Sequence, residues 1–210
     1  RAALAAAPAD ASRAALAGSF AACASRAPTP LLTPGSPPGR VRALFAFRSP
    51  AERVFLAGDM NGWSTSDQPL ERLAGTDLHV LEVDVPDGAR LDYKLVVSGT
   101  EWALDPWNPR TMTGGYGPNS ELRTPAYVPP AEVEPGPATV KGAFTEVTVE
   151  SRALGGTRRA YVWAPALPGA AGPLPALYLL DGAPYRDFAK AHLGVGDLIA
   201  ATALPPIALL

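Results

Sequence analysis

The residue types that carry out hydrolytic chemistry are sparse in this sequence. A serine hydrolase places its nucleophile on a sharp strand-to-helix turn, often written G-x-S-x-G, and no such motif occurs among the 210 residues. The nearest approach, residues 35–39, has the wrong spacing and lies in a proline-rich stretch. His79 and His192 are the two histidines, and Cys23 is the single cysteine. The sequence therefore predicts no nucleophile–base pair, no intrachain disulfide and no metal site.

The charge balance argues against several classes of partner. The formal net charge is −2, charged residues make up 18% of the chain, and basic runs are absent. Binding to nucleic acid or to an anionic membrane surface needs a basic face, so neither partner is expected. The sequence also lacks an apolar run of about 18 residues, the length that a spanning helix needs. We expect a cytoplasmic location; because the sequence does not begin with Met, loss of a secretion signal by processing is the open alternative.

The elements that would position functional side chains begin with a helix. Residues 9–25 repeat apolar side chains every three to four positions, and several prolines then predict a linker. From about residue 40 the apolar period becomes two, which indicates short strands over residues 42–47, 54–57, 79–85 and 91–97. Strands separated by Gly, Asp, Asn and Pro turns are typical of an antiparallel sandwich. We therefore expect a helix and linker over residues 1–39 and an Ig-like β-sandwich over residues 40–127.

A second pattern follows a proline-rich stretch, which predicts a linker over residues 128–140. Residues 144–150 and 159–163 are expected to be paired strands joined by a Gly-Gly turn. Residues 176–180 form a continuous apolar run, as expected for a parallel strand buried on both faces. This run ends in the sequence Asp-Gly.

The last part of the chain predicts a helix over residues 189–201 and another apolar strand over residues 207–210. Strand, helix and strand are half of the pattern that builds a parallel sheet. We therefore expect residues 141–210 to be the beginning of an α/β domain that continues past residue 210. The whole protein would then be an α/β multidomain protein with an all-β N-terminal domain.

Several groups of residues resemble known families. Residues 54–63, with the sequence V-F-L-A-G-D-M-N-G-W, are similar to the signature of isoamylase N-terminal and glycogen-binding β-sandwich modules. Further matches follow in the same order and spacing at residues 93–96, 101–102 and 105–109. Residues 117–122, the linker and the Leu-Leu-Asp-Gly turn at residues 179–182 resemble the enterochelin esterase-like proteins. In that family the sandwich precedes an α/β-hydrolase domain whose third strand ends in such a turn.

The resemblance to enterochelin esterases implies a serine ester hydrolase that needs no cofactor. Its Ser, acid and His would follow the third strand in that order, outside these residues, so His192 comes too early to be the base and is expected to be structural. The backbone N–H of Ala183 would donate to the oxyanion hole, with Gly182 permitting a tight turn; an ordinary Asp-Gly turn is the alternative. Tyr185 and Arg186 would line the acyl or alcohol pocket.

The resemblance to glycogen-binding modules implies a second candidate site on the sandwich. Relatives that bind glycans stack sugar rings on two indoles and hydrogen-bond the hydroxyls with a Lys and an Asn. The matching residues are Trp63, Lys94, Trp102 and Asn119. The alternative is that both indoles only cover the sandwich edge or pack on the second domain. Trp107, in the Asp-Pro-x-Asn-Pro turn, is expected at a domain interface.

Two function hypotheses follow. In the first, these residues are the N-terminal portion of a serine carboxylic-ester hydrolase that acts on esters of aromatic acids, such as siderophore trilactones or feruloyl esters. Its partners would be a small-molecule ester and the remainder of its own hydrolase domain, and residues 1–210 alone would be inactive. In the second, the sandwich is an α-glucan-binding module of a carbohydrate-active enzyme. A starch-debranching glycosidase would need a (β/α)₈ barrel, and the paired strands before residue 176 do not fit one.

Overall fold

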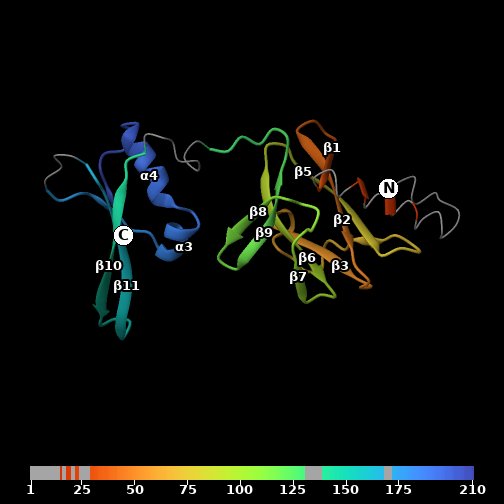
Figure 1. Cartoon of the computed structure of the whole chain (residues 1–210), viewed down its shortest axis with the longest axis horizontal. Helices are drawn as coiled ribbons and strands as arrows, with labels where there is room; N and C mark the ends of the chain where they lie inside the picture. The colour runs from red at the N-terminus through yellow and green to blue at the C-terminus, as the bar shows by residue number, and fades with distance from the viewer. Residues whose placement is uncertain (1–14, 16–17, 20–21, 24–28, 131–138, 168–171) are drawn as a thin grey trace. The chain divides into compact units, whose positions relative to one another are not determined.

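The computed structural model describes residues 15, 18–19, 22–23, 29–130, 139–167 and 172–210 (Figure 1). The helix predicted over residues 9–25 lies mostly outside the described residues. The chain divides into two compact units, Arg1–Val128 and Pro129–Leu210. Antiparallel β-sheet is the main secondary structure of both units, and each is described by itself below.

The first sheet of the first unit has the strand order β1-β2-β5-β4 and is antiparallel throughout. Its strands are β1 (Leu31–Pro34), β2 (Arg40–Arg48), β4 (Glu71–Arg72) and β5 (Leu78–Pro86). The alternation expected in the second strand is present up to Phe45, because Val41, Ala43 and Phe45 are buried while Arg40, Arg42 and Leu44 are more exposed; Ala46 is buried as well. The period of two therefore identified the face that packs inward.

The second sheet has the order β3-β6-β9-β8, with β7 paired to the free end of β6. Its strands are β3 (Val54–Gly58), β6 (Arg90–Val97), β7 (Glu101–Ala103), β8 (Thr111–Gly114) and β9 (Gly117–Arg123). A short 3₁₀ turn, η1 (Asp59–Asn61), follows β3. The strands predicted over residues 54–57 and 91–97 are β3 and β6.

The two sheets of the first unit enclose one hydrophobic core. Phe45 from the first sheet meets Tyr93 from the second edge-to-face, with ring centroids 5.0 Å apart, and Leu56, Leu95 and Leu122 complete the contact. Face-to-face packing of two antiparallel sheets around shared side chains is a sandwich arrangement. Trp107 packs on a smaller cluster of the same unit, formed by Ala46, Leu73, Leu78 and Val80.

One element of the first unit differs from the sequence prediction. The proline-rich stretch before residue 40 was expected to be a linker, yet β1 pairs with β2 in the register Leu31↔Leu44 to Pro34↔Val41. A strand at a sheet edge tolerates proline because one row of its backbone groups needs no partner. The linker prediction was therefore wrong for these four residues.

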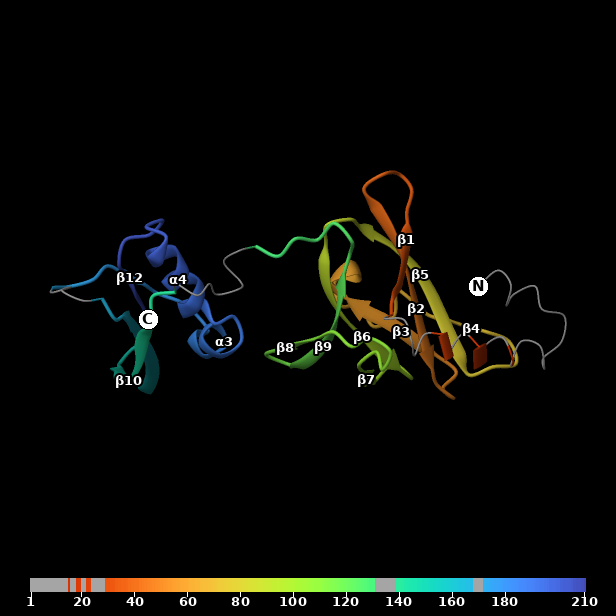
Figure 2. The same cartoon turned by 45° about the horizontal axis from the view of Figure 1, so that its top comes forward.

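The second unit contains a sheet with the order β10-β11-β13-β12. Its strands are β10 (Gly142–Ser151), β11 (Gly156–Pro165), β12 (Ala176–Leu177) and β13 (Ala208–Leu209), and its helices are α3 (Gly182–Asp187) and α4 (Ala191–Ala200). The predicted pairing of the first two strands is present, with Phe144 opposite Trp163. The helices follow β12 in the chain and lie beside each other in Figure 2.

The connection from β12 through the two helices to β13 is a parallel crossover, since Ala176 pairs with Ala208 and Leu177 with Leu209 in parallel. Trp163, which is 1% exposed, packs with Ile199 and Leu209 to form the core of this unit. This arrangement matches the predicted strand–helix–strand order, and α4 corresponds to the helix predicted over residues 189–201.

The apolar run at residues 176–180 contains a shorter strand than we predicted. Only Ala176–Leu177 is a strand; Leu177 is 45% exposed, Tyr178 74% and Leu180 86%, whereas Leu179 packs into the core. Within the described chain β12 has a neighbour on one side only. The predicted strand was therefore too long. Its predicted burial depends on neighbouring strands outside these residues and stays a prediction.

Candidate functional site

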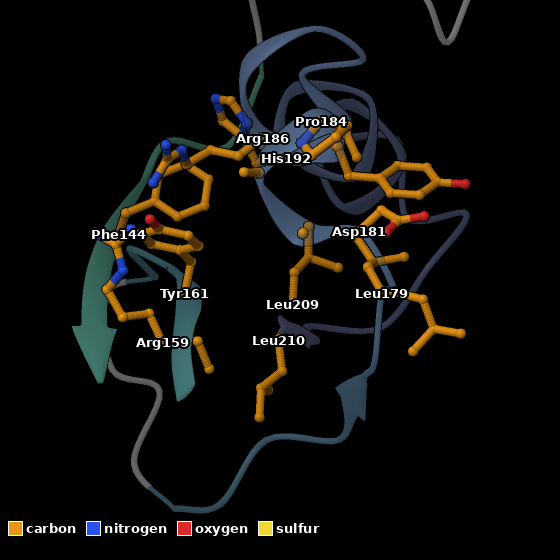
Figure 3. A pocket seen from close by; sticks show the side chains of 16 residues that line it. Phe144, Arg159, Tyr161, Leu179, Asp181, Pro184, Arg186, His192, Leu209 and Leu210 are labelled. Carbon is orange, nitrogen blue, oxygen red and sulfur yellow. The ribbon is translucent and has the colours of Figure 1, made fainter. Parts of the chain in front are cut away.

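A pocket of about 560 Å³ opens in the second unit at the beginning of α3 (Figure 3). It is lined by β10 and β11, by the turn after β12, by both helices and by the end of the chain. In Figure 3 Phe144 and Tyr161 lie on one side of the pocket, and Asp181 and Leu179 lie on the other. The pocket thus joins residues that are up to about sixty positions apart in the sequence.

Arg186 lies against an aromatic wall of this pocket. Its guanidinium carbon is 3.9 Å from the ring centroid of Tyr161, which is a cation–π contact. The same guanidinium makes a bidentate pair with Asp187, at 2.7 Å from Nε and 2.8 Å from an Nη nitrogen. These bonds raise the pKa of Arg186 and lower the pKa of the Asp187 carboxyl. The guanidinium is therefore a permanent positive charge with a fixed orientation.

The predicted oxyanion turn has a different geometry from the one expected. Asp181 precedes α3 and adopts the left-handed conformation, with φ 56° and ψ 45°, a region that Asp enters more readily than most residues. Gly182 is not among the glycines with positive φ, and a Cβ added to it would contact nothing. The tight turn is thus made by Asp181. The first N–H groups of a helix have no partner within the helix, and the N–H of Ala183 is one of them.

His192 lies at the base of the pocket on α4. Its ring meets the Phe144 ring edge-to-face at 4.9 Å and lies 6.4 Å from the Trp163 ring. Its Nδ1 is buried and has no hydrogen-bond partner among the described residues. Burial, and then the charge of Lys190, lower the pKa of His192. The ring is thus packed against two aromatic rings in the pocket wall, and the structural role expected for His192 stays a prediction.

All four residues predicted for the esterase site line this one pocket: Gly182, Ala183, Tyr185 and Arg186. The sequence analysis missed Phe144, Arg159 and Tyr161, which form the opposite wall. Tyr161 lies on a strand that was predicted, but the alternation of that strand does not reveal which face meets α3. The sequence therefore predicted the strand but not which of its faces lines the pocket.

A second pocket, of about 630 Å³, lies on the outer side of the second sheet of the first unit. The four predicted glycan-binding residues line it together, from β6, β7, β9 and the turn after η1; they are Trp63, Lys94, Trp102 and Asn119. The indoles of Trp63 and Trp102 are inclined by 38° with ring centroids 6.4 Å apart. The remaining lining residues, Gly114, Gly115 and Tyr116, were not predicted.

The motif at residues 58–63 presents Trp63 to this second pocket. A Cβ on Gly58 would lie 2.5 Å from the Asp92 carbonyl oxygen, so only glycine fits beside β6. Asn61 fastens the turn by accepting from the Gly58 N–H and donating to the Leu56 carbonyl, each at 2.9 Å. Trp63 has φ 63°, an unfavourable conformation for a bulky side chain.

The carboxylate of Asp59 holds Trp63 in this conformation. One oxygen accepts a hydrogen bond from the Trp63 indole N–H at 2.9 Å, and the other accepts from the Asp92 N–H on β6 at 2.8 Å. The indole is thereby tied to the sheet. A strained residue that is tied in place by its neighbours is often part of a functional site.

A row of charged side chains continues from the second pocket along β6 and β9. Asn119 donates to Asp92 at 3.3 Å, and Arg90 bridges Asp92 and Glu121 at 2.9 and 2.6 Å. Glu121 also binds Arg123. Burial raises the pKa of Glu121, but the two arginines outweigh burial and the net pKa is lowered. The Asn119 amide nitrogen is thus engaged by Asp92.

The Asp-Pro-x-Asn-Pro turn has a structural function. Buried Asp105 accepts hydrogen bonds from the Tyr93 hydroxyl at 2.7 Å, from Thr29 at 3.0 Å and from the Trp107 N–H at 2.9 Å. Asn108 donates to the Tyr93 hydroxyl oxygen at 2.9 Å. Burial, and then the Asp105 charge, raise the pKa of Tyr93. This network secures the segment between β7 and β8, and therefore both sides of the second pocket.

His79 is fully buried on β5 and lines neither pocket. Its Nε2 lies 3.3 Å from the Ser49 carbonyl oxygen, and its Nδ1 has no partner among the described residues. Burial is the largest cause of its lowered pKa. Across the described residues, no three His, Cys, Asp or Glu side chains form a group suited to a metal ion, and no helix is long and apolar enough to cross a membrane.

Comparison with known proteins gives matches at the level of structure. No protein-family model and no curated protein matches the chain. The ferric enterobactin esterase of Salmonella typhimurium matches with a TM-score of 0.69 and 18% identity, over 86% of this chain and 55% of that one. The Shigella flexneri enterobactin esterase, solved in the presence of enterobactin, matches with a TM-score of 0.63 and 19% identity, over 86% of this chain and 54% of that one.

The same Shigella flexneri enzyme in the presence of 2,3-dihydroxy-N-benzoyl-serine matches with a TM-score of 0.62 and 19% identity, over 90% of this chain and 55% of that one. The chain thus spans about 55% of the length of the solved structures that it resembles. It has an enterochelin esterase-like fold over most of its described length.

Proposed function

We propose that these residues are the N-terminal portion of a serine carboxylic-ester hydrolase that acts on esters of aromatic acids. The observation that carries the proposal is the pocket at α3, where Ala183 and an orientated Arg186 lie beside the aromatic ring of Tyr161. The likeness to enterobactin esterases over most of the chain supports the same assignment. In this proposal the first unit is an Ig-like sandwich and the second is the start of an α/β-hydrolase domain.

The chemistry would be acyl transfer through a serine. The serine oxygen attacks the ester carbonyl carbon while a histidine takes the serine proton, and the carbonyl oxygen becomes an oxyanion. The N–H of Ala183 donates a hydrogen bond to this oxyanion, together with an N–H that follows the nucleophile. Collapse of the intermediate expels the alcohol, which receives the proton, and water then releases the acid. The Ser, acid and His would be supplied by a segment of the protein outside these 210 residues.

The pocket chemistry favours an aromatic and electron-rich acyl group. Phe144 and Tyr161 provide aromatic faces, and the charged residues that line the pocket are Arg159, Arg186 and Asp181. Arg159 is paired with Glu146 at 3.9 Å, and Arg186 is paired with Asp187. Enterobactin and 2,3-dihydroxy-N-benzoyl-serine, present in the solved relatives, carry dihydroxybenzoyl rings of this kind. We propose siderophore trilactones as the first substrate class, with feruloyl esters as the other.

Hydrolysis by the complete protein tests this proposal. It should hydrolyse enterobactin and an aryl acetate, and replacing the serine of its nucleophile turn with Ala should abolish both activities. Residues 1–210 alone should have no turnover. Unchanged turnover in the Ser→Ala protein, or measurable turnover by residues 1–210, would disprove the mechanism.

The aromatic wall can be tested separately from the nucleophile. Replacing Tyr161 with Leu removes the ring under Arg186 and should raise the KM for enterobactin about fivefold, because such contacts are worth about 1 kcal/mol. The KM for an aryl acetate, which is too small to reach the wall, should change little. Tyr178→Ala is the matched control, since Tyr178 is exposed and does not line the pocket.

A second function, less well supported than the first, rests on one observation: the four predicted glycan-binding residues line one pocket of the first unit. The inclined indoles of Trp63 and Trp102 offer stacking faces to successive sugar rings, and Lys94 and Asn119 offer hydrogen bonds. We propose that an α-glucan binds there.

Titration of residues 1–210 with maltoheptaose tests this second function, because tryptophan fluorescence reports on both indoles. The signal should change at millimolar ligand or below, and Trp102→Ala should remove most of the change. Trp107→Phe serves as the control, since Trp107 packs on a core cluster away from the pocket. An unchanged fluorescence signal at millimolar maltoheptaose would exclude an α-glucan site.

A further inference from the structure

β10 is a long strand with one unpaired edge (Figure 1). Its register with β11 is one-to-one from Gly142↔Pro165 to Ser151↔Gly156, and no strand of the described chain pairs with its other edge. An unpaired edge presents a row of free N–H and C=O groups, and proteins usually protect such an edge by a short strand, a proline, a lysine or a bulge. β10 has ten residues, and it contains no proline, no lysine and no bulge.

The other edge strands of the described sheets are all shorter. β1 and β8 have four residues, β3 has five, and β4 and β12 have two each. β1 also ends in Pro34. β10 is therefore the edge that is long enough to pair with a further strand along most of its length.

The two faces of β10 differ in charge, because side chains alternate along a strand. The odd-numbered residues form an uncharged face: Ala143, Thr145, Val147, Val149 and Ser151. Both charges of the strand, on Glu146 and Glu150, lie on the opposite face. A strand that is added to this edge must therefore place uncharged side chains beside the first face and must keep its own acidic side chains away from the two glutamates.

A second copy of β10 meets both requirements in an antiparallel register centred on Val147. The opposed pairs are then Val147–Val147, Thr145–Val149, Glu146–Thr148 and Phe144–Glu150. Centring the register on Glu146 or on Thr148 places Glu146 opposite itself or opposite Glu150, and like charges that face each other directly destabilise a strand pair. Registers centred farther from the middle of β10 pair fewer residues. The charges of the strand thus select one register.

We propose that β10 is the interface of a symmetric dimer, in which the β10 strands of two copies of the protein pair antiparallel about Val147. The interface is isologous, since the same strand edge of both copies forms it. Backbone hydrogen bonds between the two strands supply the affinity. The uncharged faces of both copies become one continuous surface across the two-fold axis.

The dimer adds a residue of the second copy to the pocket at α3. Phe144 lines this pocket, and in the proposed register Glu150 of the second copy lies opposite Phe144 on the same face of the joined sheet. A carboxylate of one copy is then placed beside the aromatic wall of the other copy. The dimer itself depends on the strand edge alone, so it does not rest on the proposed esterase activity.

Disulfide cross-linking of the complete protein tests both the edge and the register. The exposed Cys23 is first replaced with Ser, and a cysteine is then introduced at Val147 or at Val149. Directly opposed residues of antiparallel strands have Cα atoms about 4.5–5.5 Å apart, which a disulfide can bridge. Val147→Cys should therefore give a covalent dimer on mild oxidation.

Val149→Cys is the matched control on the same face of the same strand. Val149 lies opposite Thr145 in the proposed register, so its two copies are about 13 Å apart along the strands, too far for a disulfide. Val149 is 49% exposed, whereas Val147 is partly buried. Random collisions between molecules would therefore cross-link the control more readily, and the proposed dimer predicts the opposite order.

Sedimentation velocity supplies a second measurement that needs no cysteine. The complete wild-type protein should sediment as a dimer, and Val147→Lys, which places two like charges opposite each other at the axis, should sediment as a monomer. A monomeric wild-type protein, or a dimer that Val147→Lys leaves intact, would refute β10 as the interface. Cross-linking through Val149→Cys but not through Val147→Cys would refute the register.

Discussion

The link between Asp59 and Trp63 makes a quantitative prediction for Asp59→Ala. The substitution removes the acceptors of two hydrogen bonds, from the Trp63 indole at 2.9 Å and from the Asp92 N–H at 2.8 Å. Asp59 is exposed, so we assign each bond about 1 kcal/mol and the pair about 2 kcal/mol. The left-handed conformation of Trp63 costs about 1–2 kcal/mol. Release of this strain offsets most of the loss, which leaves a net destabilisation of about 0–1 kcal/mol.

The prediction is therefore a large local change with a small change in stability. Urea unfolding should give almost the wild-type free energy of unfolding. In near-ultraviolet circular dichroism the coupling between the inclined indoles of Trp63 and Trp102, 6.4 Å apart, should largely disappear. Asp67→Ala is the matched control, because Asp67 is exposed and its carboxylate bonds only the adjacent Ser66. An unchanged dichroism spectrum in Asp59→Ala would show that Asp59 does not position Trp63.

Three further predictions concern stability. Asp105→Ala leaves the buried Tyr93 hydroxyl and two other donors without their acceptor. The free energy of unfolding of the first unit, measured in urea, should therefore fall by about 3–5 kcal/mol; a fall below about 1 kcal/mol would contradict the network. Gly196→Ala places a Cβ 2.4 Å from the Val140 carbonyl oxygen and should lower the free energy of unfolding of the second unit by about 1–3 kcal/mol. Thermal unfolding followed by Trp163 fluorescence measures this change, and an unchanged midpoint would contradict that contact. Burial lowers the pKa of His79 below its ordinary value of 6.5. As the pH falls, the unfolded chain therefore takes up the imidazole proton before the folded chain does. The free energy of unfolding should fall as the pH drops below about 6.5, by up to about 1.4 kcal/mol per pH unit. His79→Phe should flatten this part of the pH profile, and a profile identical to wild type would argue against the buried neutral histidine.

The sequence patterns predicted the long strands better than the short ones. β2, β5 and β6 alternate over eight or nine residues, which is long enough for a period of two to stand out. β1 and β7 have four and three residues, and their order comes from the strands beside them. Pro34 in β1 even argues locally against a strand. Short edge strands depend on tertiary contacts that a local pattern does not contain.

The turn of the esterase site was predictable, but its surroundings were not. The Leu-Leu-Asp-Gly sequence located the start of α3 through family resemblance. The aromatic wall formed by Phe144 and Tyr161 depends on which face of the β10–β11 hairpin meets α3, and that is decided by packing around Trp163. The parallel pairing of β12 was predicted correctly, whereas its length was not.

The pocket of the first unit was likewise predictable only in part. The positions of Trp63, Lys94, Trp102 and Asn119 came from a family pattern, and the adjacency of β6, β7 and β9 brings them together. Tyr116 was not predicted to line this pocket, because a tyrosine among glycines indicates only a turn.

The central claim is that the backbone N–H of Ala183 stabilises the oxyanion during ester hydrolysis. The most direct measurement is the steady-state kinetics of enterobactin hydrolysis by the complete protein carrying Ala183→Pro, which removes this N–H at a helix start where proline is tolerated. The account predicts that kcat falls about 10²–10³-fold while KM changes little. A folded Ala183→Pro protein with the wild-type kcat would contradict it.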